Sequence, residues 1–270
     1  MYRSDLQVAK NKNLSSKTLL ALFVVLQRKG SDYLLPFVNT FSAERVIGGN
    51  RRMDSSFSVG DMQIGHLVNF FVVKAMPDYD SYLVCLQGGE LLALLPRKYT
   101  NRVYKVGEAG WAAVFDIKGA RINLSQKSPQ YIRKILEYLT APLIQEKQIR
   151  FKKVALVAGA SFCKAAVAVE NEMSTKDLLD LCKPYLAHIK QYVAEHVILV
   201  KYSDDIEEYA VNALFPGPKR AVKKVISISD LKTLTVYVDN ASLAVFYGRK
   251  GQNVAAAAKL TGVNIEIKGL

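Results

Sequence analysis

The spacing of apolar and polar residues changes several times along this chain of 270 residues. Within residues 1–58 one stretch has helical spacing, and it predicts a helix from Ser16 to Gln27 with Ser15 or Ser16 as N-cap and Gly30 as its stop. The segment that follows, FSAERVIGGNRRMDSS, combines a glycine pair with arginines and small polar residues. We interpret this segment as a linker.

From Val59 onward the pattern becomes one of short β-rich runs separated by turn signals. The runs are HLVNFFVVKA, SYLVCLQ, GELLALLP, WAAVFDIKG and ARINLSQ, and the turns contain PDYD, GG, KVGEAG and KG. Five short strands within residues 59–126, with no long helix among them, predict a small closed β-barrel of the OB type.

Helical spacing returns at Ser128, where one face gathers apolar residues at Tyr131, Ile132, Ile135, Leu136 and Leu139. Two strands, two helices and a strand follow, which gives the order α-β-β-α-α-β. The same order then starts again at Asp204, whose spacing to Glu207 is that of a capping box. The chain therefore contains an internal repeat of about 70 residues, and each copy predicts a helical layer on a three-stranded sheet.

Together these patterns predict an α+β protein of several domains. We expect a partly helical N-terminal segment at residues 1–58, the five-stranded barrel at 59–126, a first repeat at 127–202 and a second repeat at 203–270.

Composition adds a strong positive charge, with 37 basic against 24 acidic residues and a net charge of +13. Such an excess favours a polyanionic partner, either nucleic acid or an anionic membrane surface, and it is spread over the predicted folded segments. The longest apolar run, Leu19–Leu26, is shorter than the about 20 residues that span a bilayer, and the start lacks a secretory pattern. The cysteines lie far apart, which suits a reducing compartment, so we expect a cytoplasmic protein without a membrane partner: Cys85, Cys163 and Cys182.

The second repeat contains the sequence Gly248-Arg249-Lys250-Gly251 between its two consecutive helices. Glycines allow positive φ and close approach to a phosphate, the following helix offers unpaired N–H groups, and the two cations attract phosphate. A KH domain clamps single-stranded nucleic acid with such a GXXG loop. GXXG is common by chance, but its position in an α-β-β-α-α-β unit favours a phosphate clamp over a plain turn.

The first repeat has Lys183-Pro184-Tyr185-Leu186 at the equivalent position, with no glycine and one backbone donor removed by proline. We predict that this copy has lost the clamp and that Lys183 and Lys190 make only loose phosphate contacts. In the barrel, Phe70, Phe71 and Tyr82 are candidates for base stacking. Alternation along a strand prevents both phenylalanines from facing outward, so we expect Tyr82 and one of them, taken as Phe70, to bind RNA.

Enzyme signatures are absent from the sequence, which has no GxSxG, HExxH or Walker motif. The three histidines stand alone, and the carboxylates from Asp204 to Glu208 suit a helix N-terminus better than a metal site. We therefore expect no enzyme, no catalytic residue, no metal and no cofactor.

Several segments resemble a known family. VGDMQIGHLVNFFVV, GELLALLPRKY and YKVGEAGWAAVFDIKGARINLSQKSP resemble an S1 RNA-binding domain. KYSDDIEEYAVNALFPGPKRAVKKV and VDNASLAVFYGRKGQNVAAAAKLTGVNIEIK resemble the second KH domain of the bacterial transcription termination/antitermination factors of the NusA family, in which S1 precedes two KH domains. The resemblance covers about residues 59–270, nearly four fifths of the chain.

The resemblance implies a monomeric factor that binds nascent single-stranded RNA and RNA polymerase and modulates pausing, termination and antitermination. By motif, the phosphate clamp would be Gly248, Arg249, Lys250 and Gly251, with Gln252 and Asn253 close to the RNA. Residues 1–58 stand where the family has its polymerase-docking domain, and we interpret them as its remnant. Two alternatives stay open: an RNA-binding subunit of a ribosome-maturation or RNA-degradation assembly, and an enzyme acting on RNA.

Overall fold

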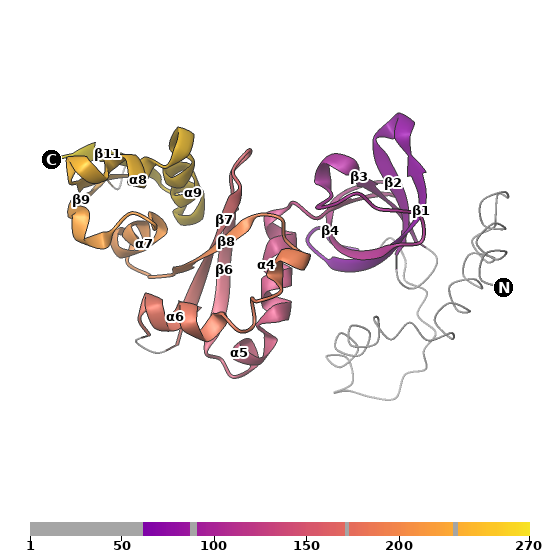
Figure 1. Cartoon of the computed structure of the whole chain (residues 1–270), viewed down its shortest axis with the longest axis horizontal. Coiled ribbons are helices and arrows are strands. Elements are labelled where there is room, and N and C mark those ends of the chain that lie inside the picture. The colour runs from indigo at the N-terminus through magenta and orange to yellow at the C-terminus, as the bar shows by residue number, and fades with distance from the viewer. Residues whose placement is uncertain (1–61, 87–90, 171–172, 229–231) are drawn as a thin grey trace.

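The structure is a computed structural model that describes residues 62–86, 91–170, 173–228 and 232–270. The predicted helix Ser16–Gln27 and the predicted linker lie outside these residues. The described part forms an elongated row of three units, with the barrel at one end, the first repeat in the middle and the second repeat at the other end (Figure 1).

The barrel is built from β1 (Leu67–Met76), β2 (Ser81–Leu86), β3 (Leu92–Pro96), β4 (Ala109–Lys118) and β5 (Arg121–Ser125). The strands close in the order β1-β2-β3-β5-β4, with β4 pairing back onto β1. All pairs are antiparallel except β3 with β5, which meet in parallel at Leu94 and Asn123. The prediction of a five-stranded OB-type barrel is confirmed.

One side of the barrel packs directly against the first repeat. Leu67 and Trp111 contact the apolar core of that repeat, and the Trp111 indole stacks on Tyr138 with 6.5 Å between ring centroids. The Asn101 side chain also donates a hydrogen bond to the backbone carbonyl of Tyr192. The barrel keeps an interior core of its own, and its contacts with the first repeat run through Leu67, Trp111 and the buried Ala113.

The first repeat contains α4 (Pro129–Leu139), α5 (Ala141–Gln145), β6 (Ile149–Leu156), β7 (Phe162–Val169), α6 (Thr175–Cys182) and β8 (His196–Lys201). Its sheet has the order β6-β7-β8, with β8 parallel to β7. Helix α4 begins as predicted at Ser128, whose hydroxyl accepts the N–H of Tyr131.

The second of the two helices predicted after β7 does not form. After α6 the chain makes turns and one short 3-10 helix, Ile189–Gln191, before β8. The reason is local, because Pro184 follows the C-cap Lys183 and cannot continue the helix. Tyr185 and Leu186 then turn into the core of the repeat.

The second repeat contains α7 (Ile206–Ala213), β9 (Val222–Ile228), β10 (Thr233–Val238), α8 (Leu243–Tyr247), α9 (Gln252–Thr261) and β11 (Asn264–Gly269). Its sheet has the order β9-β10-β11, with β11 parallel to β10. The cap of α7 corrects the sequence prediction, since Asp205 and not Asp204 accepts the N–H of Glu207, at 2.9 Å. Asp204 instead accepts the Tyr202 hydroxyl.

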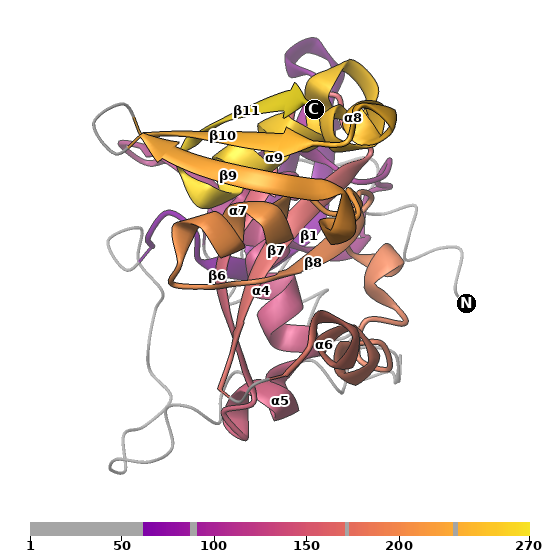
Figure 2. The ribbon, with the colours of Figure 1, turned by 90° about the vertical axis from the view of Figure 1, so that its left-hand side faces the viewer.

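The two repeats stack so that the first sheet is covered on both faces. Along β7, Cys163, Ala165 and Val167 face the core that contains α4, whereas the intervening Ala166 faces the core of the second repeat. Helices α7 and α9 lie between the two sheets (Figure 2). The buried alanines of α9 serve this contact, because Ala257 shares a core with Ala155 and Ala166.

A buried lysine joins the repeats at the centre of this contact. Lys164 of β7 has no exposed surface, and its ammonium group donates to the backbone carbonyls of Ala213 and Phe215 at the C-terminal end of α7. Burial lowers the pKa of Lys164 to about 7. Either protonation state retains hydrogen atoms for both carbonyls, so the first repeat fixes the last turn of α7.

Candidate nucleic-acid interface

The loop Gly248–Gly251, called the clamp loop below, joins α8 to α9 in an unusual backbone conformation. Gly248, Lys250 and Gly251 all have positive φ, at 68°, 52° and 72°. The N–H of Gly251 bonds to the carbonyl of Gly248 at 3.1 Å, which closes the loop on itself. Gly251 caps α9 without a side chain, so no side chain of the loop competes for the first N–H groups of this helix.

Gly248 is required here for two separate reasons. Its φ of 68° and ψ of 176° fall in a region open essentially to glycine alone. A Cβ atom at Gly248 would also lie 2.7 Å from the Cβ of Asn253. Gly251 is less constrained, because its conformation is left-handed helical and an added Cβ would meet only Val254, at 4.0 Å. The first glycine allows close packing of the loop on α9, and the second allows the turn into it.

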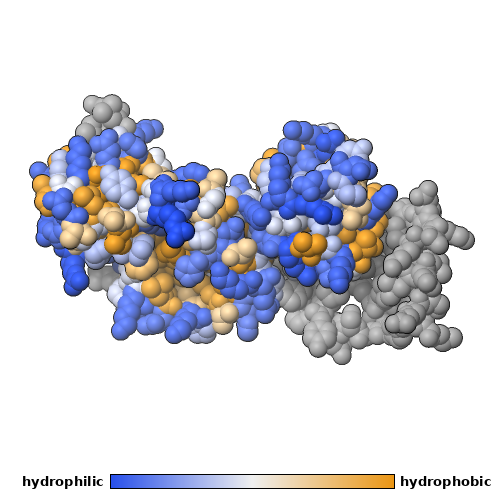
Figure 3. All heavy atoms as spheres, turned by 45° about the horizontal axis from the view of Figure 1, so that its top comes forward, coloured by the Kyte–Doolittle hydropathy of each residue, from blue (hydrophilic) through white to orange (hydrophobic). Residues whose placement is uncertain are grey.

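Arg249 and Lys250 project from the clamp loop into solvent. Among the described residues neither side chain forms an ion pair or a hydrogen bond, whereas Arg133 and Lys134 on α4 both pair with Glu137. Unpaired cations beside a helix N-terminus create a positive site that suits a phosphate group. On the face shown in Figure 3, hydrophilic side chains and hydrophobic patches alternate over the described units.

The sequence analysis placed Asn253 close to the RNA. The structure corrects this expectation, because the Asn253 side chain is buried. The side chain is 4% exposed, and its amide donates to the carbonyls of Leu214 and Phe246 at 2.9 and 2.8 Å. Asn253 therefore ties the start of α9 to the ends of α7 and α8. Gln252 is half-buried at the first position of α9, adjacent to the clamp loop, where contact with RNA stays a prediction.

The equivalent loop of the first repeat is closed. Lys183 is the C-cap of α6, and Tyr185 and Leu186 pack into the core of the repeat. Lys183 and Lys190 are both exposed, and Lys190 donates to the carbonyl of Ala194 at 3.2 Å. Without positive-φ residues or a following α-helix, this loop presents side-chain charge only.

The prediction that Phe70 and Tyr82 form a surface for base stacking on the barrel is wrong. Phe70 and Tyr82 are each 1% exposed and belong to the interior of the barrel, where both rings contact Tyr104 edge-on. Alternation along β1 did operate, but it turned Phe70 inward. Rings in this position have no free face for a base.

Another aromatic pair lies on the barrel, formed by the exposed Phe115 and the half-buried Tyr99, and the sequence analysis did not identify it. Phe115 of β4 is exposed and lies 5.1 Å from the ring of Tyr99, while the Lys98 ammonium lies 4.9 Å from the centroid of Tyr99. An exposed ring beside a cation is typical of single-strand binding surfaces. No pattern in the apolar run WAAVF distinguishes Phe115 as the exposed position.

Other chemistry finds little support. The described residues contain no group of three or more histidine, cysteine or acidic side chains that could hold a metal ion. Nor do they include a helix of the length and apolarity needed to cross a membrane. The cysteines are free and buried, and burial raises the pKa of the Cys163 thiol to about 12 and that of the Cys182 thiol to about 11.

Comparison with known proteins agrees with this geometry. Residues 206–270 match the family model of the NusA-like second KH domain. The chain is 30% identical over 200 residues to the transcription termination/antitermination protein NusA of Halalkalibacterium halodurans, covering 70% of this chain and 50% of the relative. For the NusA proteins of Rickettsia prowazekii and Bacillus subtilis the identities are 29% and 28%, covering 75% and 70% of this chain and 41% and 52% of the relatives.

The chain thus spans about half the length of the curated relatives it matches. The match covers the second repeat, an α-β-β-α-α-β unit with the clamp loop at the KH position. It is preceded by a first repeat that lacks the helix after the equivalent loop, and by an OB-type barrel. In fold, in domain order and in sequence, this is a NusA-like protein with an S1-type barrel and two tandem KH domains.

Proposed function

We propose that this chain is an RNA-binding transcription factor that contacts nascent single-stranded RNA and RNA polymerase and so modulates pausing, termination and antitermination. The similarity to NusA proteins supports this class of function. It gives no support to the alternatives of a ribosome-maturation subunit, an RNA-degradation subunit or an enzyme. The division into segments 1–58, 59–126, 127–202 and 203–270 is part of the proposal.

The observation that carries the proposal is the clamp loop. Two positive-φ glycines frame two exposed cations at the start of a ten-residue helix, and in the described structure both cations lack an acidic partner. An RNA phosphate at this point would receive backbone N–H groups from the loop and α9 and charge from Arg249 and Lys250. Gly248 and Gly251 provide the space, and Gln252 lies next to the bound phosphate.

Binding of a single-stranded RNA oligonucleotide at several salt concentrations tests this role. We expect the double variant Arg249→Ala with Lys250→Ala to weaken binding and to reduce the salt slope by about 1.4, since each phosphate contact on a single strand contributes about 0.7. The matched control is Arg133→Ala with Lys134→Ala, an adjacent pair on α4 that loses the same charge but is paired with Glu137. Equal effects of the two double variants, or a flat salt profile, would contradict the proposed clamp.

Contact with RNA polymerase is tested separately. The tagged full chain should recover polymerase subunits from its host after nuclease treatment, because the proposal includes a protein contact. Recovery of ribosomal or nuclease subunits without polymerase would contradict this part of the proposal and would leave the clamp untouched.

A further inference from the structure

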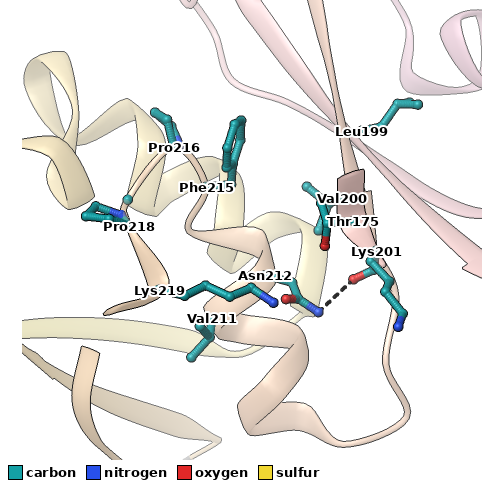
Figure 4. Close-up of a pocket in the computed structure, with 11 residues that line it drawn as sticks. Thr175, Leu199, Val200, Lys201, Val211, Asn212, Phe215, Pro216, Pro218 and Lys219 are labelled. Carbon is teal, nitrogen blue, oxygen red and sulfur yellow. Dashed lines mark hydrogen bonds between the residues drawn. The ribbon is translucent and has the colours of Figure 1, made fainter. Parts of the chain in front are cut away.

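A pocket lies where the first repeat meets the second. Its volume is about 420 Å³, within the range of small-ligand sites, and Figure 4 shows its lining. Val200 and Thr175 come from the first repeat, and Asn212, Phe215 and Lys219 come from the second. The pocket therefore exists only because the two repeats are docked.

The walls are mainly apolar, and one of them is held rigidly. The carbonyl of Phe215 is fixed by Lys164, and the next residues are Pro216, Gly217 and Pro218. Gly217 packs so closely on Phe246 that an added Cβ would lie 2.5 Å from its ring. The Phe215 side chain is nevertheless 46% exposed. The pocket wall therefore includes a partly exposed aromatic ring on a backbone that Lys164 holds in place.

A few polar groups converge on this apolar site. Asn212 is 5% exposed, and its amide nitrogen donates to the carbonyl of Lys201 at 3.1 Å, while its oxygen has no hydrogen-bond partner among the described residues. In Figure 4 the Lys219 side chain extends toward this amide group. The Thr175 hydroxyl also lines the pocket and makes no hydrogen bond within the described part of the chain. A buried acceptor without a donor is costly unless a ligand supplies one.

We propose that this pocket binds one nucleobase of the RNA, an inference that rests on the proposed RNA-binding function. The base stacks on Phe215, and Lys219 moves from the Asn212 amide to an adjacent phosphate. This movement uncovers the Asn212 oxygen, which is buried in the described structure, for an exocyclic amine of the base. The Thr175 hydroxyl, which comes from the first repeat, supplies a second hydrogen bond. Bases that carry an exocyclic amine (adenine, cytosine and guanine) satisfy Asn212, whereas uracil offers only a ring N–H between two carbonyls.

The pocket and the clamp loop are connected through one side chain. Asn253 follows the clamp loop and donates to the carbonyl of Leu214, the residue that precedes Phe215. Both sites therefore depend on the last turn of α7, which Lys164 and Asn253 hold from opposite repeats. The clamp loop holds the backbone without reading sequence, and the pocket reads one base.

Affinities for the homopolymeric RNA oligonucleotides of adenine, cytosine and uracil test the proposal on the full chain. We expect the wild-type chain to bind the uracil oligomer about two- to tenfold more weakly than the other two, the range that one hydrogen bond supports. Phe215→Leu, which keeps apolar bulk but removes the ring, should weaken binding of all three by about fivefold or more. Asn212→Leu should remove the preference against uracil.

Further variants keep the outcome interpretable if Asn212→Leu fails to fold. Thr175→Val deletes one hydroxyl at nearly constant volume and should reduce affinity for the adenine oligomer by about two- to tenfold. Lys219→Ala removes the proposed contact with the adjacent phosphate and should weaken RNA binding. Its control is Lys224→Ala, which changes an exposed lysine of β9 outside the pocket. If RNA binds with no base preference and the pocket variants behave like the control, the pocket inference is overturned while the clamp survives. Loss of polymerase recovery at unchanged RNA affinity would overturn it too, by assigning the pocket to a protein partner.

Discussion

The two repeats have the same order of strands but differ in the segment after the helix that follows their second strand, which is α6 in the first repeat and α8 in the second. In the second repeat the clamp loop is open, with positive-φ glycines, exposed cations and a ten-residue helix behind it. In the first repeat the corresponding segment closes on its own core through Tyr185 and Leu186, and the helix after it is lost. The first repeat instead supplies Lys164 and one face of its sheet to the second. The second repeat thus carries the proposed clamp, and the first repeat supports it.

The largest expected effect, on both stability and RNA affinity, comes from replacing Gly248, because this removes a glycine that the closed segment also lacks. Gly248→Ala should destabilise the second repeat by at least about 1–3 kcal/mol, because φ is 68° and the new Cβ meets Asn253 at 2.7 Å. RNA affinity should fall with it. Denaturant unfolding and RNA binding measure both effects. The control Gly251→Ala has open space around its Cβ and should cost less, so equal losses at both positions would contradict the distinction drawn between the two glycines.

A second test concerns the support that the first repeat gives. Lys164 has a pKa of about 7 in the folded protein, below its ordinary value of 10.5, so the folded state binds fewer protons between these values. Stability should therefore rise with pH over this window, by up to about 1.4 kcal/mol per pH unit. Thermal or denaturant unfolding of the wild type and of Lys164→Met at pH 7, 8 and 9 isolates this term. A difference that does not change with pH would show that burial does not lower the pKa of Lys164 in the folded protein.

The smallest expected effect on RNA affinity comes from changes in the closed segment of the first repeat. Lys183→Ala with Lys190→Ala removes two exposed charges from the closed segment, but no backbone donors point at a phosphate there. RNA affinity should fall by less than twofold at about 150 mM salt, where the Debye length is about 8 Å. The RNA-binding titration proposed above for Arg249→Ala with Lys250→Ala provides the reference. A loss as large as that of the clamp variant would show that both repeats hold RNA backbone.

The sequence predicts the strands of this protein better than it predicts the helices or the side-chain orientations, for physical reasons. Strand runs and turn signals are local, so the barrel and both three-stranded sheets were predicted with nearly correct limits. The helix after Pro184 was wrongly predicted because its apolar residues suit a helix and a packed turn equally well. Phe70 and Tyr82 were placed on the surface because residue type reports an aromatic side chain but not the face of the strand that carries it.

The sequence by itself determined the order of elements, the internal repeat and the position of the glycines, since these depend on spacing and on the conformations each residue allows. Tertiary structure alone decided that the first sheet is buried on both faces, that Asn253 is a structural residue and that Phe115 is an exposed ring. It alone brought Thr175, Asn212 and Phe215 to one pocket. Those properties depend on contacts between segments far apart in the chain, and no local pattern records such contacts.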